Sequence, residues 1–404
     1  RLAGFGGSWA SGSLPPQVGS RRSVGMPNVA YVAQLRKPVR TTNPWNALVP
    51  GAVAGVMTDT DTSRTTDPVL QEAPLGFQWP TIDPFLFCAH HRDDYPAGND
   101  ALGPDAPLVG RSIGQDFDGV DGWNMYHGDV VPGFPQHPHR GFETVTFVRS
   151  GLIDHSDSLG AAARFGRGDV QWMTAGRGVV HSEMFPLLDR DGPNPAELFQ
   201  IWLNLPAEDK LVDPYFTMLW NHDIPRIATS GDDGATATVT VIAGRLEGVT
   251  APPPPPNSWA ARSEAEIGIW HISLDPGASW ELPPTAGEDT VRTLYLFEGS
   301  ELTIGGHVIG ASTGALLASD APVRLTATGT AVEALVLQGR PIGEPVARYG
   351  PFVMNTEAEI EQAFADYRET GFGGWPWDVD APVHGRHQGR FARHADGRRE
   401  DIGD

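Results

Sequence analysis

Short runs of β-branched and aromatic residues, broken by Gly, Pro and Asp, recur through most of this chain. Examples are "ETVTFV", "DVQWM" and "FQIWLNL" in one half and "ATVTVIAG", "GIWHISL" and "EALVLQGRP" in the other. Short apolar or alternating runs with turn residues at both ends are typical of β-strands rather than helices. The sequence therefore predicts an all-β protein.

These strand-like runs form two blocks, and 404 residues are enough for two domains that each bury a core. The first block begins near "LGFQWPTIDPFLF", and the second follows a short polar break. Within the second block, "APPPPPNSW" must be a loop, because proline cannot take part in a sheet ladder. We predict two β-barrel domains in tandem, over residues 75–226 and 236–376.

The two ends of the chain differ from the domains in composition. The first acidic residue is Asp59, and the segment before it is rich in Gly, Ser, Pro and Arg. That composition fits an organelle transit peptide, a disordered tail or a start assigned upstream of Met26. We expect residues 1–70 to be a disordered extension without a targeting role. Residues 377–404 contain few apolar side chains, which predicts a mobile tail with solvated histidines.

The net charge of −21 excludes several classes of function. Nucleic-acid binding depends on Lys and Arg neutralising phosphates, so direct DNA or RNA contact is not expected. The best apolar run, "ALVPGAVAGVM", is too short to cross a bilayer. Cys88 is the single cysteine, which rules out an intrachain disulfide and a cysteine-based zinc site. We therefore expect a cytoplasmic protein.

One helix is predicted, in "NTEAEIEQAFADYRETG". Thr356 and Glu359 have the spacing of a capping box, Ile360 and Phe364 lie at a helical interval, and Gly371 is a stop signal. The apolar side of this helix should pack on the barrels.

Two pairs of potential metal ligands stand out in the first domain. His137 and His139 occur in "HPHRGFETVTFV", and His181 and Glu183 occur in "GRGVVHSEMFP". Residues i and i+2 of a strand face the same side, so each pair can point its two side chains into one barrel. Three imidazoles and one carboxylate suit Fe(II), Mn(II), Ni(II), Co(II), Cu(II) or Zn(II). The sequence therefore predicts a site for one divalent metal ion.

"HPHRGFETVTFV", "GDVQWMTAGRGVVHSEM" and "YGPFVMNTEAEIEQA" closely resemble the pirin family, a branch of the cupin superfamily built from two β-barrel domains. The resemblance runs from about Gly76 to about Pro376. It implies that one metal, usually described as iron, is held in the N-terminal barrel by the four residues already named. It also implies that the C-terminal barrel is metal-free, in keeping with His271 and His307, which stand alone in the sequence.

A competing carboxylate ligand must be considered. In cupins generally the glutamate of the first motif binds the metal, which here is Glu143, and a regular strand would turn it to the same face as His139. Pirins use the glutamate of the second motif, so we favour Glu183 as the ligand. Glu143 is then expected near the site, orienting an imidazole. Alternatively, Glu143 forms a salt bridge with Arg140 or with another arginine on the rim of the barrel. Either Glu183 or Glu143 could act as the catalytic base.

The resemblance implies an activity as well. Pirin-like bacterial proteins are similar to cupin dioxygenases that cleave flavonols such as quercetin with dioxygen and release carbon monoxide. A flat aromatic substrate would suit a pocket lined by apolar side chains from the motifs: Phe134, Phe142, and one of Trp172 and Met173, which alternate in direction.

Two other functions stay open from the sequence. The first is a metal-dependent regulatory protein without turnover, such as a transcriptional co-regulator or a partner of metabolic enzymes, which the acidic surface would allow. The second is a cupin isomerase or hydrolase acting on a small polar metabolite, which would use basic residues near the motifs such as Arg140 and Arg177.

Overall fold

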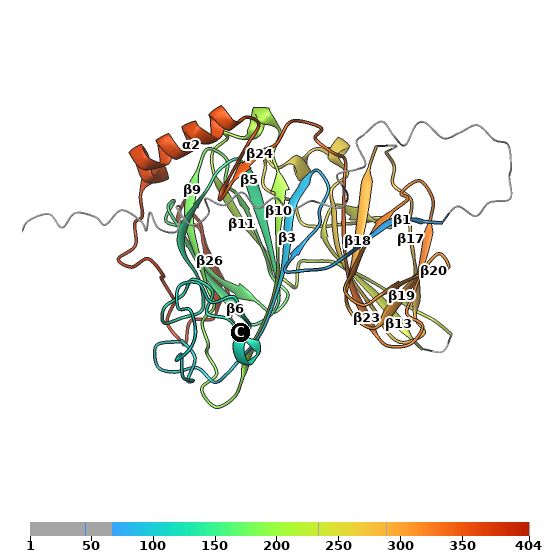
Figure 1. Cartoon of the computed structure of the whole chain (residues 1–404), viewed down its shortest axis with the longest axis horizontal. Coiled ribbons are helices and arrows are strands. Elements are labelled where there is room, and N and C mark those ends of the chain that lie inside the picture. Colours follow the sequence, from blue (N-terminus) through green and yellow to red (C-terminus); the bar gives the residue numbers. More distant parts are fainter. Residues whose placement is uncertain (1–44, 46–66, 233, 288, 404) are drawn as a thin grey trace, which may run out of the picture.

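The computed structural model describes Trp45 and residues 67–232, 234–287 and 289–403. Two β-domains lie side by side, and the helix α2 (Glu357–Thr370) crosses one end of the N-terminal domain (Figure 1). This arrangement confirms the predicted all-β pair of domains with a C-terminal helix. No helix among the described residues is long and apolar enough to cross a membrane.

The N-terminal domain consists of two six-stranded antiparallel sheets. In spatial order, the inner sheet contains β11 (Tyr215–Leu219), β8 (Val170–Thr174), β5 (Phe142–Ser150), β10 (Asn194–Asn204), β3 (Phe85–Tyr95) and β2 (Gln78–Trp79). The outer sheet contains β27 (Arg399–Gly403), β26 (Arg390–Arg393), β7 (Ala162–Gly166), β6 (Leu152–Asp157), β9 (Val179–Met184) and β4 (Gly133–His139). The side chains between these two sheets form the lumen of the barrel.

The C-terminal domain has one large and one small sheet. The large sheet is ordered β1 (Val69–Pro74), β21 (Thr313–Leu317), β18 (Val291–Glu298), β23 (Val332–Gly339), β16 (Gly268–Leu274), β13 (Thr236–Ala243) and β12 (Arg226–Ser230). The small sheet is ordered β17 (Ser279–Leu282), β22 (Val323–Thr326), β19 (Glu301–Ile304) and β20 (His307–Gly310). Two further hairpins pair β14 (Arg245–Leu246) with β15 (Val249–Thr250) and β24 (Ala347–Tyr349) with β25 (Phe352–Met354).

Short 3-10 helices occupy several connections: η1 (Val120–Gly122), η2 (Ala207–Asp209), η3 (Trp259–Ala261), η4 (Ser263–Ala265) and η5 (Gly371–Gly373). The proline-rich stretch is a loop, as predicted, and it leads directly into η3.

An apolar core joins the two domains. Side chains of the inner N-terminal sheet, such as Phe147 and Phe199, pack in one cluster with Tyr295 and Leu335 of the large C-terminal sheet. Trp79 stacks on Tyr295 with ring centroids 5.1 Å apart. Burying large apolar side chains of this kind contributes on the order of 2 kcal/mol each. The outward face of the inner sheet is therefore committed to the domain interface, and the opposite face is left for the lumen.

The C-terminal helix begins and ends where the sequence predicts. Thr356 caps it, the capping box with Glu359 is formed, and Gly371 ends it in a left-handed conformation. Its buried side chains Ile360 and Ala363 pack in a cluster with Phe352 of β25. After β23 the chain thus returns to the N-terminal domain, where the backbone of Arg140 forms hydrogen bonds with Pro351 and Val353.

The prediction of a mobile tail over residues 377–404 is wrong. Strand β26 pairs with β7 and with β27, which extends the outer sheet of the N-terminal domain. The Arg164 guanidinium is fully buried and donates to the backbone carbonyls of His384, Gly385 and Gln388. Polar and backbone interactions hold this segment in place. Its scarcity of apolar residues is therefore not a sign of disorder. His394 is buried rather than solvated.

The predicted boundaries also shift at two other places. Strand β1 begins at Val69, inside the segment predicted to be disordered, and pairs with β21 of the C-terminal domain. Most of the predicted extension lies outside the described residues. Strand β12 begins at Arg226 and pairs with β13, so the C-terminal domain begins about ten residues before position 236.

Candidate metal centre

The three motif histidines meet in the lumen of the N-terminal barrel. His137 and His139 lie on β4, and His181 lies on β9 directly opposite His137 in the strand register. The ring centroids of His137 and His181 are 4.4 Å apart, and those of His139 and His181 are 4.9 Å apart. One ring nitrogen from each residue lies within 4.8 Å of the other two. The predicted convergence of the two motifs on one point is therefore found for the histidines.

Gly133 at the start of β4 allows this close approach. Its φ is +130°, and a Cβ atom at this position would lie 2.4 Å from the carbonyl oxygen of Glu183. Only glycine therefore fits where β4 enters the pairing with β9.

All three imidazoles are in the neutral form that can bind a metal. Burial lowers the pKa of His137 to about 4 and lowers the pKa values of His139 and His181 well below the usual range. The rings are therefore neutral at physiological pH and keep a lone pair for coordination. Among the described residues, neither ring nitrogen of His181 has a hydrogen-bond partner, although both are buried. Buried polar atoms are rarely left unpaired, so a divalent cation fits this donor set.

Glu183 lies beside the histidines and is held by two polar neighbours. Its carboxylate accepts a hydrogen bond from Gln200 at 2.8 Å and one from the Thr146 hydroxyl at 3.3 Å. One carboxylate oxygen is 3.9 Å from Nε2 of His181. Burial raises the pKa of Glu183, with its hydrogen bonds acting in the opposite direction. A carboxylate at this position can complete a three-nitrogen, one-oxygen ligand set or accept a proton from a bound substrate.

Glu143 faces the other way, which corrects the role predicted for it as a catalytic or imidazole-orienting residue. Its carboxylate accepts hydrogen bonds from Thr174 at 2.6 Å and from Ser258 of the proline-rich connection at 2.5 Å. The strand is not regular between His139 and Glu143, because Gly141 has a φ of +83° and separates β4 from β5. The alternation of faces is therefore broken, and Glu143 lies at the domain interface.

The basic residues near the motifs are engaged elsewhere. Arg140 does not pair with Glu143. It donates to Asp366 of α2 at 2.6 Å. Arg177 is exposed and forms an ion pair with Asp213. Neither arrangement offers a free cation to a small polar metabolite at the histidine cluster.

The placement of Glu143 leads to a prediction about pH. Burial raises the pKa of Glu143 to about 7, from an ordinary value of 4.5. Because the folded-state pKa is the higher one, the folded protein holds this proton more tightly. The stabilisation is complete below about pH 4.5 and is lost as the pH rises through 7, by up to about 3 kcal/mol. The variant Glu143→Gln should remove this part of the pH dependence.

This prediction is checked by measuring the free energy of unfolding of both proteins between pH 5 and pH 8. All other titrating groups are shared, so the difference between the two curves isolates Glu143. Parallel curves over that range would contradict the assignment.

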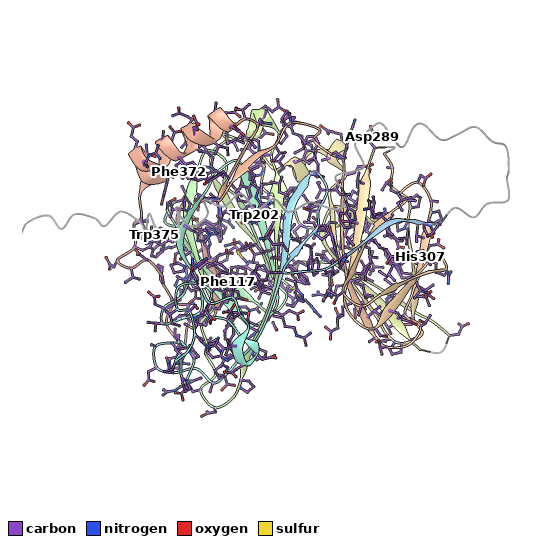
Figure 2. All side chains as sticks on the ribbon, viewed as in Figure 1. Phe117, Trp202, Asp289, His307, Phe372 and Trp375 are labelled. Carbon is purple, nitrogen blue, oxygen red and sulfur yellow. The ribbon has the colours of Figure 1, made fainter. Side chains whose placement is uncertain are left out.

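Aromatic side chains lie against the histidines on two sides. The Trp202 ring is 5.5 Å from that of His139 and 4.2 Å from that of Phe142, and Figure 2 shows Trp202 within the N-terminal domain. The ring centroids of Phe134 and His137 are 6.4 Å apart. Trp172 packs in the apolar core between the domains, whereas Met173 packs in a separate cluster with Val179 of β9. The two neighbours thus face opposite sides of β8, as predicted. Aromatic side chains thus form part of the wall around the cluster.

Sequence reasoning missed a fourth histidine in the same lumen. His155 of β6 is fully buried, and its ring centroid is 5.5 Å from that of His181. Its Nε2 lies 3.3 Å from the carboxylate of Asp157, which is also buried. The signal was present as a third i, i+2 pair, His155 and Asp157 in "LIDHSD", one strand away from the second motif.

The C-terminal domain shows no comparable cluster within the described residues, where His137, His139 and His181 form the one group of potential ligands. His271 pairs with Glu333, and His307 pairs with Asp67 and Glu72 at 2.7 Å each. That this barrel holds no metal remains a prediction.

Fold and site together define a tandem cupin-type protein with a histidine cluster in its N-terminal barrel. The Pirin family model matches residues 72–203, and the Pirin C-terminal cupin domain model matches residues 269–373. A Pirin-like protein of Caulobacter vibrioides is 38% identical over 244 residues, which cover 60% of this chain and 82% of the relative. The human protein Pirin is 32% identical over 281 residues, which cover 66% of this chain and 88% of human Pirin. This chain belongs to the pirin family.

A solved structure adds a catalytic relative. Quercetin 2,3-dioxygenase from Acinetobacter baumannii superposes with a TM-score of 0.59 at 26% sequence identity, covering 76% of this chain and 98% of the other.

Proposed function

We propose that His137, His139, His181 and Glu183 bind one divalent metal ion, with Fe(II) as the physiological ion. The proposal is supported by the three neutral imidazoles whose nitrogens lie within 4.8 Å of one another and by the Glu183 carboxylate beside them. Three nitrogen donors and one carboxylate oxygen are compatible with Fe(II), and also with Mn, Ni, Co, Cu and Zn. Metal analysis must therefore decide the identity of the ion.

The reaction that this site supports best is the dioxygenation of a flavonol such as quercetin. The metal would supply a Lewis acid for the enol oxygen and a redox centre for dioxygen. Two ring carbon–carbon bonds break, and the carbon between them leaves as carbon monoxide with its own oxygen. Each of the two carbons left behind receives one atom of dioxygen, so the product is a phenolic ester with a carboxyl group.

The residues of this chain have separate roles in that reaction. Glu183 takes the proton of the enol hydroxyl and later returns it to the product, because its carboxylate lies beside the histidine cluster where the enol oxygen would bind. Gln200 and Thr146 hold the carboxylate in place. Phe134 is half-buried and offers a flat apolar surface on which a ring of an aromatic substrate can stack, while Trp202 packs against Phe142 and forms the wall behind His139. The observation that carries the proposal is this combination of a buried ligand cluster, a carboxylate and aromatic walls.

The test is turnover. Protein reconstituted without oxygen with Fe, Mn, Ni, Co or Cu is mixed with quercetin and air, and the loss of flavonol absorbance is followed together with carbon monoxide release. We expect turnover with at least one metal, and none with Glu183→Gln. A protein that binds metal in stoichiometric amounts and turns over no flavonol would instead support a metal-dependent regulatory or binding role towards a protein partner.

A further inference from the structure

The buried pair His155 and Asp157 has no role in the function proposed so far. Both side chains face the lumen, because in the register of β6 and β9 His155 lies opposite Glu183 and Asp157 lies opposite His181. The pair therefore shares one face of the outer sheet with two of the proposed ligands.

Several contacts fix the orientation of the His155 ring. Its Nε2 lies 3.3 Å from Oδ2 of Asp157, and the ring stacks on Phe216 with an interplanar angle of 11°. Asp157 is itself held, because its Oδ1 accepts the backbone N–H groups of Leu159 and Ala161 at 2.9 Å each. A carboxylate accepts but does not donate, so the tautomer of His155 that fits Asp157 carries its hydrogen on Nε2. Its Nδ1 is left as an acceptor.

His181 has a ring nitrogen that needs a hydrogen-bond acceptor. Its Nε2 is the nitrogen on the side of Glu183, at 3.9 Å. When Nε2 serves a metal, Nδ1 of the neutral ring carries the hydrogen and needs an acceptor. Among the described residues, Nδ1 of His181 and Nδ1 of His155 both lack a hydrogen-bond partner, and both are buried. A donor and an acceptor thus lie unpaired on neighbouring rings, whose centroids are 5.5 Å apart.

We propose that Asp157 and His155 form a hydrogen-bonded relay behind the ligand His181, in which His155 accepts the outer N–H of that ligand through one bridging water. The relay positions His181 and increases its donor strength, as carboxylate and carbonyl partners do for metal-bound histidines elsewhere. His155 and Asp157 are positioning residues here, and the proposal rests on the proposed metal site.

The decisive variant is Asp157→Asn. An asparagine keeps the size of the side chain and an oxygen for Leu159 and Ala161, but presents an N–H to His155. His155 must then carry its hydrogen on Nδ1, which turns the acceptor into a donor and breaks the relay without removing a ring. His155→Ala removes the relay altogether. Ser156→Ala is the matched control, because Ser156 is equally buried on the same strand but faces the other side.

The probe is Co(II), used with the full-length protein. We expect Asp157→Asn and His155→Ala to weaken Co(II) binding by about 10- to 100-fold in a chelator competition and to shift the ligand-field absorption bands, while Ser156→Ala leaves both unchanged. The slowly exchanging, hyperfine-shifted N–H signal of His181 in the proton NMR spectrum should also disappear in both variants. If His155→Ala fails to fold, Asp157→Asn decides alone.

Wild-type affinity and wild-type bands in Asp157→Asn would overturn the relay and leave the metal site intact. No Co(II) binding by the wild-type protein would overturn the metal site, and the relay with it.

Discussion

The variant His139→Ala is expected to lose stoichiometric metal binding. His139 supplies one of three imidazoles that converge within 4.8 Å, and it lies buried between β9 and the Trp202 ring. With one of four donors removed, the two histidines and the carboxylate that remain hold the ion more weakly, so we expect it to be lost during desalting. The metal content after reconstitution and desalting, measured by elemental analysis, should fall from about one ion per chain to a small fraction of that.

His307→Ala provides the control for this prediction. His307 pairs with Asp67 and Glu72 on the C-terminal domain, far from Trp202, which lies beside the cluster (Figure 2). It should keep the full metal content. An undiminished ion in His139→Ala would mean that the metal is bound elsewhere.

The variant Arg164→Ala is expected to lose about 3 to 5 kcal/mol of folding free energy. Arg164 forms two hydrogen bonds of 2.7 Å with Asp154, and both side chains are fully buried. Removing the guanidinium leaves the carboxylate of Asp154 uncompensated in the interior, and it also frees the backbone carbonyls of His384, Gly385 and Gln388. Urea unfolding measures the first effect, and limited proteolysis of the C-terminal segment measures the second.

A double variant separates charge from packing. Replacing Arg164 and Asp154 together by leucine removes the buried charge and should recover part of the lost stability, although the C-terminal segment stays unclamped. Wild-type stability and wild-type protease resistance in Arg164→Ala would show that the buried pair does not hold the tail.

The sequence predicted those parts of the site that depend on local periodicity. The i, i+2 spacing of His137 with His139 and of His181 with Glu183 was enough to put each pair on one face of a strand, and the capping box at Thr356 and Glu359 was enough to place the helix. Each of these signals lies within a few neighbouring residues. The structure contains both the paired side chains on the strands and the capped helix.

The errors have two physical causes, a tight turn and contacts between distant segments. Glu143 was misplaced because the turn at Gly141 changes the face on which the next strand presents its side chains. The tail was misjudged because Arg164, more than two hundred residues earlier, supplies the hydrogen bonds that order it. His155 was missed because only the pairing of β6 with β9 brings it to the ligands. The contacts of Arg164 and His155 join residues far apart in the sequence, so the residues next to them do not show what they contact.

Glu183 is tested most directly as a metal ligand by comparing the metal content of Glu183→Ala with that of Glu143→Ala after identical reconstitution. The two glutamates are equally buried, but only Glu183 faces the histidine cluster. We predict a sharp loss of bound metal in Glu183→Ala and nearly one ion per chain in Glu143→Ala. Full metal content in Glu183→Ala, with loss in Glu143→Ala, would contradict the proposed ligand set.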